Sequence, residues 1–300
     1  MTTIVQPDWI AADWGTSNLR VWAMSADGSV LAEATSDQGM GKLSKDGFEA
    51  AFLDLCSDWI SGPTTVVACG MVGARQGWAE AKYAHVPCPA MPEGFAKACT
   101  QNPNLSVHII PGICQDEPAD VMRGEETQIA GFLARNTNWD GILCLPGTHT
   151  KWVHVSADEV VSFQTFMTGE LFATISETSV LRHSIADDGW DDDAFAEAVT
   201  ETITRPEKLA AQMFNLRARH LLRDTAGPVA RARLSGLLIG AELAAARPYW
   251  LGQQIAVIGA GSVASIYVQA LGLQGAPATQ VQGDHVTLAG LTAAYNRLKG

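Results

Sequence analysis

The chain has 300 residues, of which 47% are hydrophobic and 17% are charged, and its net charge is −12. This length is enough for two domains that each have a hydrophobic core. The acidic balance argues against nonspecific binding to nucleic acid or to an anionic membrane surface. An anionic substrate would therefore have to be bound by a local group of positive residues.

The six cysteines show no Cys-x-x-Cys spacing, and the first residues do not have the pattern of a signal peptide. We therefore expect reduced thiols in a cytoplasmic protein. Residues 255–283 carry no charge, which could suggest a membrane helix. The glycines, glutamines and Pro277 of this stretch argue against such a helix and favour a buried strand, a turn and a helix.

Apolar runs separated by turn residues divide the first half of the chain into short elements. Strands are expected over 9–12, 19–25, 30–35, 65–69 and 107–110. Apolar residues at helical spacing predict a helix over 48–60, and a second helix is expected over 124–135. The glycine-rich loop "GMVGARQGW" follows the fourth strand.

The second half has the same alternation. Strands are expected over 141–145, 151–155, 159–166 and 255–258. Helices are expected over 168–181, 205–222, the stretch "LSGLLIGAELAAA", the segment from the Gly259 turn to Leu271, and 284–298.

Two stretches, "IAADWGTSNLRVW" and "ILCLPGTHTKWVHV", have the same order of an apolar strand, a tight polar turn and a second strand. Strands alternate with helices around both. We therefore predict an α/β protein of two related domains, 1–135 and 136–300. Each domain is expected to have a mixed sheet flanked by helices, and the two are expected to face a central cleft.

The first hairpin carries an acid at the tip of its first strand, Asp13. Its turn offers backbone N–H groups and small polar side chains, which suit phosphate oxygens. An acid beside phosphate makes sense if a Mg²⁺ ion lies between them, held by Asp13 through water. An ordinary polar hairpin remains the alternative, since these are common turn residues. The candidate phosphate-binding residues are Gly15, Thr16, Ser17 and Asn18.

The second hairpin and a later glycine turn extend this interpretation to a nucleotide. Gly169 and Glu170, which begin the next helix, are further candidates for holding the nucleotide or the metal. The glycine turn suits the floor of an adenosine pocket, because it follows a strand and opens a helix. A dinucleotide site is not favoured, since no acid follows about 20 residues later. The candidate ATP-binding residues are Gly147, Thr148, His149, Thr150, Lys151, Gly259, Gly261 and Ser262.

Several motifs together resemble the 2-dehydro-3-deoxygalactonokinase family of the acetate and sugar kinase/heat-shock/actin superfamily. They are "ADWGTSNLRVW", "CGMVGARQGW", "DVMRGEETQIAGF", "LPGTHTKWV", "FMTGELFA", "FNLRARHLL" and "SGLLIGAEL". The resemblance implies two ribonuclease H-like, actin-like ATPase domains. It also implies transfer of a phosphoryl group from Mg²⁺-bound ATP to O6 of 2-dehydro-3-deoxy-D-galactonate, in galactonate breakdown.

Such a kinase needs a carboxylate that accepts the proton of the sugar hydroxyl. The resemblance places this group at the start of the helix before the second hairpin, where Glu125 and Glu126 follow Gly124. Exopolyphosphatases of the superfamily have a similar Gly-x-Glu-Glu stretch, which favours Glu126. Neighbours on a helix point about 100° apart, so only one should face the cleft. Glu125 remains the alternative base, and Asp13 is a third catalytic candidate.

A sugar acid also needs a receptor for its carboxylate, and a guanidinium binds carboxylate with two parallel hydrogen bonds. Arg75 is the first candidate, since its glycine-rich loop follows a strand. Trp78 is expected to stack on the sugar, and Gly39 and Met40 are expected to form another wall. The remaining substrate-binding candidates are Gln76, Tyr83 and Arg123.

Two other classes of function stay open at this point. A phosphatase or exopolyphosphatase of the same superfamily would release phosphate without a sugar acceptor. A non-enzymatic, actin-like module would need assembly surfaces that the sequence does not mark. ATP and a small sugar acid are the expected partners, without nucleic acid or membrane, and a homodimer is kept open. The sequence leaves the choice between galacto and gluco epimers undecided.

Overall fold

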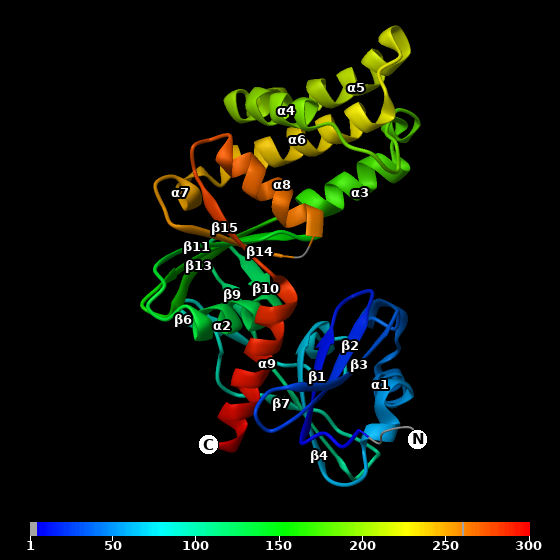
Figure 1. The fold of residues 1–300 in the computed structure, drawn as a ribbon, viewed down its shortest axis with the longest axis vertical. Helices are drawn as coiled ribbons and strands as arrows, with labels where there is room; N and C mark the ends of the chain where they lie inside the picture. Colours follow the sequence, from blue (N-terminus) through cyan, green and yellow to red (C-terminus); the bar gives the residue numbers. More distant parts are fainter. Residues whose placement is uncertain (1–4, 260) are drawn as a thin grey trace. The chain divides into compact units, whose positions relative to one another are not determined.

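The computed structural model describes residues 5–259 and 261–300. The chain divides into two compact units (Figure 1). Residues up to 139, with 156–162 and 283–300, form the first unit, and residues 140–155 and 163–282 form the second. This division differs from the expected boundary after residue 135 mainly because the last helix, α9 (Gly283–Lys299), is grouped with the first unit.

The first unit contains a mixed sheet in the strand order β3-β2-β1-β4-β8-β7 (Figure 1). Strands β1, β2 and β3 pair antiparallel, whereas β4 runs parallel to β1 and β8. The bounds are β1 (Trp9–Trp14), β2 (Leu19–Met24), β3 (Val30–Ser36), β4 (Thr64–Gly70), β7 (Ala96–Lys97) and β8 (Leu105–Ile109). A smaller sheet, in the order β10-β9-β5, consists of β5 (Tyr83–His85), β9 (Gly112–Gln115) and β10 (Asp120–Met122).

Helices cover both faces of the larger sheet. Successive residues of β1 face opposite sides, as in any strand. Ile10 and Trp14 belong to the same core as α1 (Phe48–Cys56). Trp9 faces the other side, where its ring stacks on Tyr295 of α9 with centroids 4.3 Å apart. Asp13 has the parity of Trp9 and therefore lies on the side of α9.

Helix α2 (Glu125–Arg135) packs closely on α9, and small residues make this possible. A Cβ atom on Gly131 would lie 1.9 Å from the carbonyl oxygen of Val286, and one on Gly290 would lie 2.0 Å from that of Thr127. Larger residues at either glycine would separate the two helices. The N-terminal turns of both helices are thereby held beside the tip of β1.

Short 3₁₀ helices connect parts of both units. They are η1 (Met40–Lys42), η2 (Lys45–Gly47), η3 (Ser57–Trp59) and η4 (Met71–Gly73) in the first unit, and η5 (Val180–His183) and η6 (Pro206–Lys208) in the second.

The second unit is built on a sheet in the order β15-β14-β11-β12-β13. The bounds are β11 (Gly141–Leu145), β12 (Thr150–Ser156), β13 (Glu159–Phe166), β14 (Ile255–Ile258) and β15 (Ala278–Val281). Strand β6 (Cys88–Pro89) pairs with the first residues of β13, at Glu159 and Val160, which belong to the first unit.

The helices of the second unit pack around α6, which has buried residues on all sides (Figure 1). Its Gly236 and Gly240 let α4 approach, since Cβ atoms there would lie 2.6 Å from Phe195 O and 2.8 Å from Val199 O. The bounds are α3 (Thr168–Thr178), α4 (Asp192–Thr204), α5 (Leu209–Arg223), α6 (Gly227–Ala245), α7 (Arg247–Trp250) and α8 (Gly261–Gly272). The predicted α/β class, with mixed sheets and flanking helices, is confirmed.

None of the helices within residues 5–259 and 261–300 has the length and apolarity that a membrane span needs.

Candidate active site

Three backbone segments of the first unit meet at the tip of β1, and glycines let them approach. Gly70, at the end of β4, has φ 88°, and a Cβ there would lie 2.5 Å from Trp14 O. Gly124, just before α2, has φ 110°, and its Cβ would lie 3.4 Å from Gly70 Cα. Both positions favour glycine because φ is positive, and at Gly70 a side chain would also collide with the Trp14 carbonyl.

A cavity of about 160 Å³ lies where these segments meet, and we call it the first-unit cavity. Residues from β1, from the end of β4, from the start of α2 and from α9 line it. They are Asp13, Trp14, Gly15, Gly70, Met71, Arg123, Gly124, Glu125, Gln128 and Thr287.

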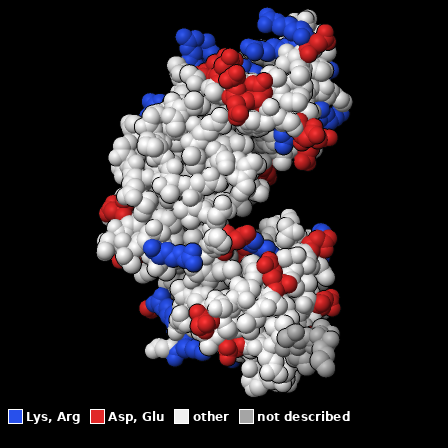
Figure 2. Space-filling view, in the orientation of Figure 1, with Lys and Arg blue, Asp and Glu red and all other residues white. Residues whose placement is uncertain are grey.

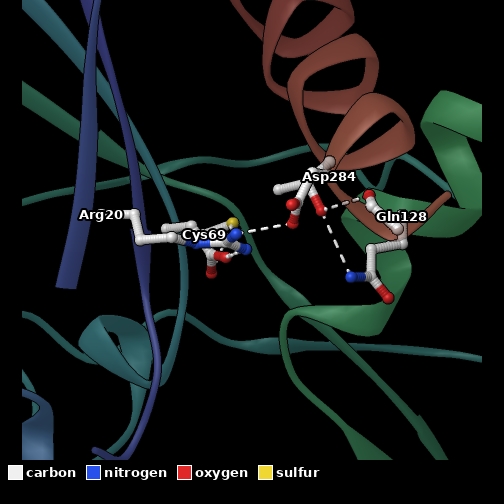
Figure 3. Close-up of polar contacts among 7 residues, drawn as sticks. Arg20, Cys69, Gln128 and Asp284 are labelled. Atoms are coloured by element: carbon white, nitrogen blue, oxygen red, sulfur yellow. Dashed lines mark hydrogen bonds and ion pairs between the residues drawn. The ribbon is translucent and has the colours of Figure 1, made fainter. Parts of the chain in front are cut away.

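Asp13 is held at this cavity by Arg20, which also binds the start of α9. Arg20 Nη2 donates to Asp13 Oδ2 at 2.7 Å, and Nη1 donates to Asp284 Oδ1 at 2.6 Å. Figure 3 shows Arg20 and Asp284 pointing toward one another, with Gln128 of α2 on the other side of α9's first turn. Burial alone would lower the pKa of Arg20, but the hydrogen bonds to Asp13 and Asp284 outweigh it and raise that pKa. Arg20 therefore stays charged and fixes the orientation of the Asp13 carboxylate.

The structure separates the two glutamates at the start of α2. Glu125 lines the first-unit cavity, and its Oε2 accepts the Arg123 backbone N–H at 3.1 Å. Glu126 is 0% exposed, and its Oε2 accepts the Gly124 N–H at 2.6 Å. We expected Glu126 to face the site, but the helix places its side chain in the interior of the protein.

Burial raises the pKa of Glu126 to about 8, and the neighbouring charge of Glu125 adds to this rise. A carboxyl whose pKa is higher in the folded than in the unfolded chain stabilises the fold at low pH, and this contribution falls as pH rises through about 8. Glu126→Gln should remove this dependence. The difference in melting temperature between variant and wild type should therefore shift in favour of the variant from pH 5 to pH 8.5, as thermal unfolding would measure. A difference that stays constant with pH would contradict the raised pKa.

The two candidate arginines have opposite environments. The Arg75 side chain is 82% exposed, and its ion-pair contact is a loose one of 3.7 Å to Glu80. Arg123 lines the first-unit cavity, its Nη2 donates to Ala81 O at 2.8 Å, and its guanidinium lies 4.3 Å from the Tyr83 ring centroid. Its Nε and Nη1 atoms are buried and make no hydrogen bond to any residue that the structure describes. Such donors are costly unless an acceptor binds them.

Trp78 was expected to stack on the sugar, but its ring lies elsewhere. It is buried in the core of the first unit, where its ring lies 6.1 Å from that of Trp14 and 6.2 Å from that of Phe52. Its Nε1 donates to the Cys99 carbonyl at 3.2 Å. Burying its apolar ring in the core stabilises the fold more than leaving the ring exposed in the loop would. Gln76 lies exposed beside Arg75, outside the residues that line the cavity.

Gly39 and Met40 support the first hairpin instead of forming a separate wall. The N–H of Gly39 donates to Ser17 O and that of Met40 to Gly15 O, at 3.2 and 3.0 Å. A Cβ on Gly39 would lie 2.3 Å from the Ser17 carbonyl carbon, so only glycine fits there. The hairpin itself is closed by Gly15 N–H and Asn18 O at 2.9 Å. Thr16, Ser17 and Asn18 are exposed at its tip.

The second unit has a much larger cavity, of about 1050 Å³, which we call the second-unit cavity. Its walls include the second hairpin, the first turns of α3 and α8, and one side of α6. Helix N-termini attract anions through their N–H groups and dipole. The polar and glycine residues lining these walls include Gly147, Thr148, Thr168, Gly169, Ser235, Ser262, Ser265 and Tyr267.

The second hairpin is attached to the start of α3. The N–H of Glu170 donates to Thr148 O at 3.0 Å, and the Glu170 carboxylate lies 2.5 Å from His149 Nε2. A Cβ on Gly169 would lie 2.2 Å from Gly147 O, so this contact depends on glycine.

The five predicted residues of the second hairpin divide into two groups. Gly147 and Thr148 line the second-unit cavity, and His149 is exposed beside them. Thr150 and Lys151 are only 0% and 4% exposed and lie in β12, outside the lining of the cavity. We predicted phosphate contacts for these two residues, but both side chains are buried in β12.

The late glycine turn reaches the cavity through Ser262, which lines it in the first turn of α8. Gly261 has φ 62° and begins that helix. Gly259 packs against α8 instead, since its Cβ would lie 3.3 Å from that of Ala264. Ala260 lies outside the described residues.

A buried glutamate, Glu242 of α6, connects three walls of the second-unit cavity. It accepts hydrogen bonds from Trp152 Nε1 and Tyr267 OH, both at 2.8 Å, and from the Thr168 hydroxyl. Burial raises its pKa, although these donors act in the opposite direction. Sequence reasoning missed Glu242, since the motif "SGLLIGAEL" gives no sign of which partners its acid meets.

A family model for 2-keto-3-deoxy-galactonokinase matches residues 13–294, which include the residues of both cavities. The chain belongs to the 2-keto-3-deoxy-galactonokinase family. It is therefore a member of a family of sugar-acid kinases, as the sequence motifs predicted.

Relatives of known name agree with this family. The chain is 40% identical to a probable 2-dehydro-3-deoxygalactonokinase of Rhizobium meliloti, over 95% of this chain and 96% of that one. It is 35% identical to the 2-dehydro-3-deoxygalactonokinase of Escherichia coli, over 94% of this chain and 96% of that one. The crystal structure of a proposed 2-dehydro-3-deoxygalactonokinase from Sinorhizobium meliloti superposes with a TM-score of 0.89 at 38% identity, covering 97% and 99% of the two chains. The sugar kinase and actin-like ATPase fold is thus confirmed.

Proposed function

We propose that this family member transfers the γ-phosphoryl group of ATP to O6 of 2-dehydro-3-deoxy-D-galactonate. The observation that carries the assignment of roles is the first-unit cavity. It is lined by Arg123, by a glutamate at a helix start and by an aspartate fixed by an arginine. Each of these groups meets one need of a sugar-acid kinase.

Arg123 is proposed to bind the substrate carboxylate. Its buried Nε and Nη1 lack partners among the described residues, and a carboxylate can accept hydrogen bonds from a guanidinium at two points. The bond to Ala81 O and the Tyr83 ring hold the guanidinium in place. Arg75, the first candidate from the sequence, is too exposed to gain as much from an ion pair.

Glu125 is proposed as the general base. As the 6-hydroxyl oxygen bonds to the γ-phosphorus and the bond from that phosphorus to the bridging oxygen of ADP breaks, the hydroxyl proton moves to the Glu125 carboxylate. The backbone N–H of Arg123 orients this carboxylate through the 3.1 Å hydrogen bond. Fully buried Glu126 supports the turn at Gly124 instead.

The second-unit cavity is proposed to bind ATP. Its volume is large enough for a nucleotide, and its hairpin and helix N-termini offer N–H groups to phosphate oxygens. Gly147, Thr148 and Ser262 are the predicted ATP-binding residues that line it. The first hairpin, at Thr16, Ser17 and Asn18, offers similar groups in the first unit.

The residues of the first unit fit Mg²⁺ that arrives with ATP. Asp13 Oδ2 is bound by Arg20, while the contact of Oδ1 is a weak one, 3.7 Å from Cys69 Sγ. Mg²⁺ commonly keeps several waters and is held by one or two carboxylates and by the phosphates of its substrate. The described residues contain no cluster of three or more metal-binding side chains, which agrees with such a water-mediated role for Asp13. The ion supplies positive charge to the phosphate oxygens.

Gly169→Val should raise the KM for ATP about tenfold or more, with a smaller change in the KM for the sugar acid. The added side chain would collide with Gly147 O and push the second hairpin away from α3. Steady-state kinetics with each substrate varied in turn would measure both values. Gly62→Val is a matched control, because a Cβ on Gly62 meets nothing within 4 Å. Equal effects on both KM values would contradict a nucleotide role for this contact.

The direct test of the proposed function is a coupled assay of ADP production from Mg²⁺-bound ATP. Parallel reactions would contain 2-dehydro-3-deoxygalactonate, its gluco epimer or no acceptor. We expect turnover only with a sugar acid, and the fastest turnover with the galacto form. Equal ADP release without an acceptor would instead support the hydrolase or the ATP-gated module. One hydroxyl contact can discriminate the epimers by about 1–3 kcal/mol.

A further inference from the structure

Helix α5 of the second unit has an unpaired apolar face. Three of the four most exposed large apolar side chains among the described residues lie on it: Phe214, Leu221 and Leu222, with exposures of 64%, 62% and 82%. The opposite side of the helix, including buried Leu216, packs on the core shared with α6. Exposed apolar side chains grouped in this way mark an interaction surface.

The exposed face follows a heptad pattern of alternating small and large residues. Ala211 and Ala218 are separated by seven residues, as are Phe214 and Leu221, and the two series are offset by three or four. This is the spacing of the seam of a two-helix coiled coil. Ala210 and Leu222 flank the seam at its two ends.

The pattern is self-complementary when two copies of α5 run antiparallel about a twofold axis at the level of residue 216. Phe214 then lies opposite Ala218 of the second copy, and Leu221 lies opposite Ala211. Each large side chain meets a small one, which is how helices interdigitate at native packing density. A parallel pair would instead place Phe214 against Phe214 and Ala218 against Ala218, leaving a clash beside a void.

The charges at the ends of the helix agree with the same register. Lys208, just before α5, comes opposite Asp224 of the second copy, just after it. Glu207 and Arg223 come near one another in the same way. All four side chains are exposed, and none has an ion pair among those found in the described residues. Figure 2 shows basic and acidic side chains close together over the end of the second unit that carries α4, α5 and α6.

We propose that the protein forms a homodimer through antiparallel pairing of α5 with α5 of a second copy. An isologous contact of this kind closes after two subunits. The antiparallel pairing also opposes the two helix dipoles favourably. This surface is separate from the residues that line either cavity.

Light scattering coupled to size-exclusion chromatography on the full chain would test the proposal. The wild type should have twice the chain mass of 31.9 kDa. Phe214→Glu combined with Leu221→Glu should give the mass of one chain, since each change places a charge in the seam. Leu251→Glu, at a side chain that is also 62% exposed but lies after α7, should leave the dimer intact. Far-UV circular dichroism and thermal unfolding would show that the variants are folded.

A charge exchange tests the register itself. Lys208→Glu and Asp224→Lys should each raise the dimer dissociation constant several-fold, and the double variant should restore it. A wild type that stays monomeric up to the highest concentration reached would overturn the proposal. A dimer that survives the Phe214 and Leu221 changes, or a double variant weaker than both single ones, would overturn it as well.

Discussion

Glu125→Gln should lower kcat by about 10²- to 10⁴-fold, which is the usual loss when a general base is removed. Glutamine has nearly the shape of glutamate and can still accept a hydrogen bond from the Arg123 N–H, so the start of α2 should stay in place. It cannot take up the hydroxyl proton. The KM values for ATP and for the sugar acid should therefore change much less than kcat in steady-state kinetics.

The neighbouring residue provides a matched control for this experiment. Glu126→Gln makes the same chemical change one position along the helix, at a side chain that is 0% exposed. Burial raises the pKa of Glu126 to about 8, so its carboxyl is largely protonated at neutral pH and glutamine resembles that state. We expect kcat within about tenfold of wild type. The reverse result, with Glu126 essential and Glu125 dispensable, would return the catalytic role to Glu126.

Arg123→Ala should lower kcat/KM for the sugar acid by about 10- to 10²-fold, because a hydrogen bond to a charged group contributes about 1.5–3 kcal/mol. The KM for ATP should stay nearly unchanged. An analogue with an uncharged amide in place of the carboxylate separates binding from structural effects. The wild type should discriminate strongly against this analogue, and the variant should not.

Arg75→Ala is the control for the loss of positive charge. Its side chain is 82% exposed with a loose contact to Glu80, so its removal should change kcat/KM by less than about threefold. A large loss at Arg75 together with a small loss at Arg123 would move the carboxylate site to the glycine-rich loop. Thermal unfolding of both variants would show whether either loss comes from instability.

Local pattern and motif order were enough to predict the fold class and the chain positions of the elements that line the first-unit cavity. The hairpin at Asp13, the helix after Gly124 and the helix that closes the chain all lie within a few residues of their expected bounds. The contact between Arg20 and Asp13 could also have been predicted, since the two residues are paired in the antiparallel register of the first hairpin. The contact between Arg20 and Asp284 could not have been predicted in this way, because it depends on packing between segments 264 residues apart.

Side-chain direction accounts for most of the differences. Sequence proximity did not distinguish Glu125 from Glu126, and only the way α2 packs on α9 decides which of them reaches a cavity. The position of Trp78 in a glycine-rich loop suggested that it could contact a ligand, but its ring packs in the core beside Trp14. Strand β15 was not predicted from the sequence. Its residues, "ATQV", have little apolar character, and they form a strand by extending the sheet.

The place of α9 also has a consequence for how the chain is made. The helix completes the core around Trp9 and supplies Thr287 to the first-unit cavity, yet it follows the whole second unit in the sequence. During synthesis, the ribosome must produce more than 280 residues before the strands at the start of the chain can pack against α9. The nascent chain therefore exposes one apolar face of its first sheet for most of translation, and the first-unit cavity can form only after the second unit has been synthesised.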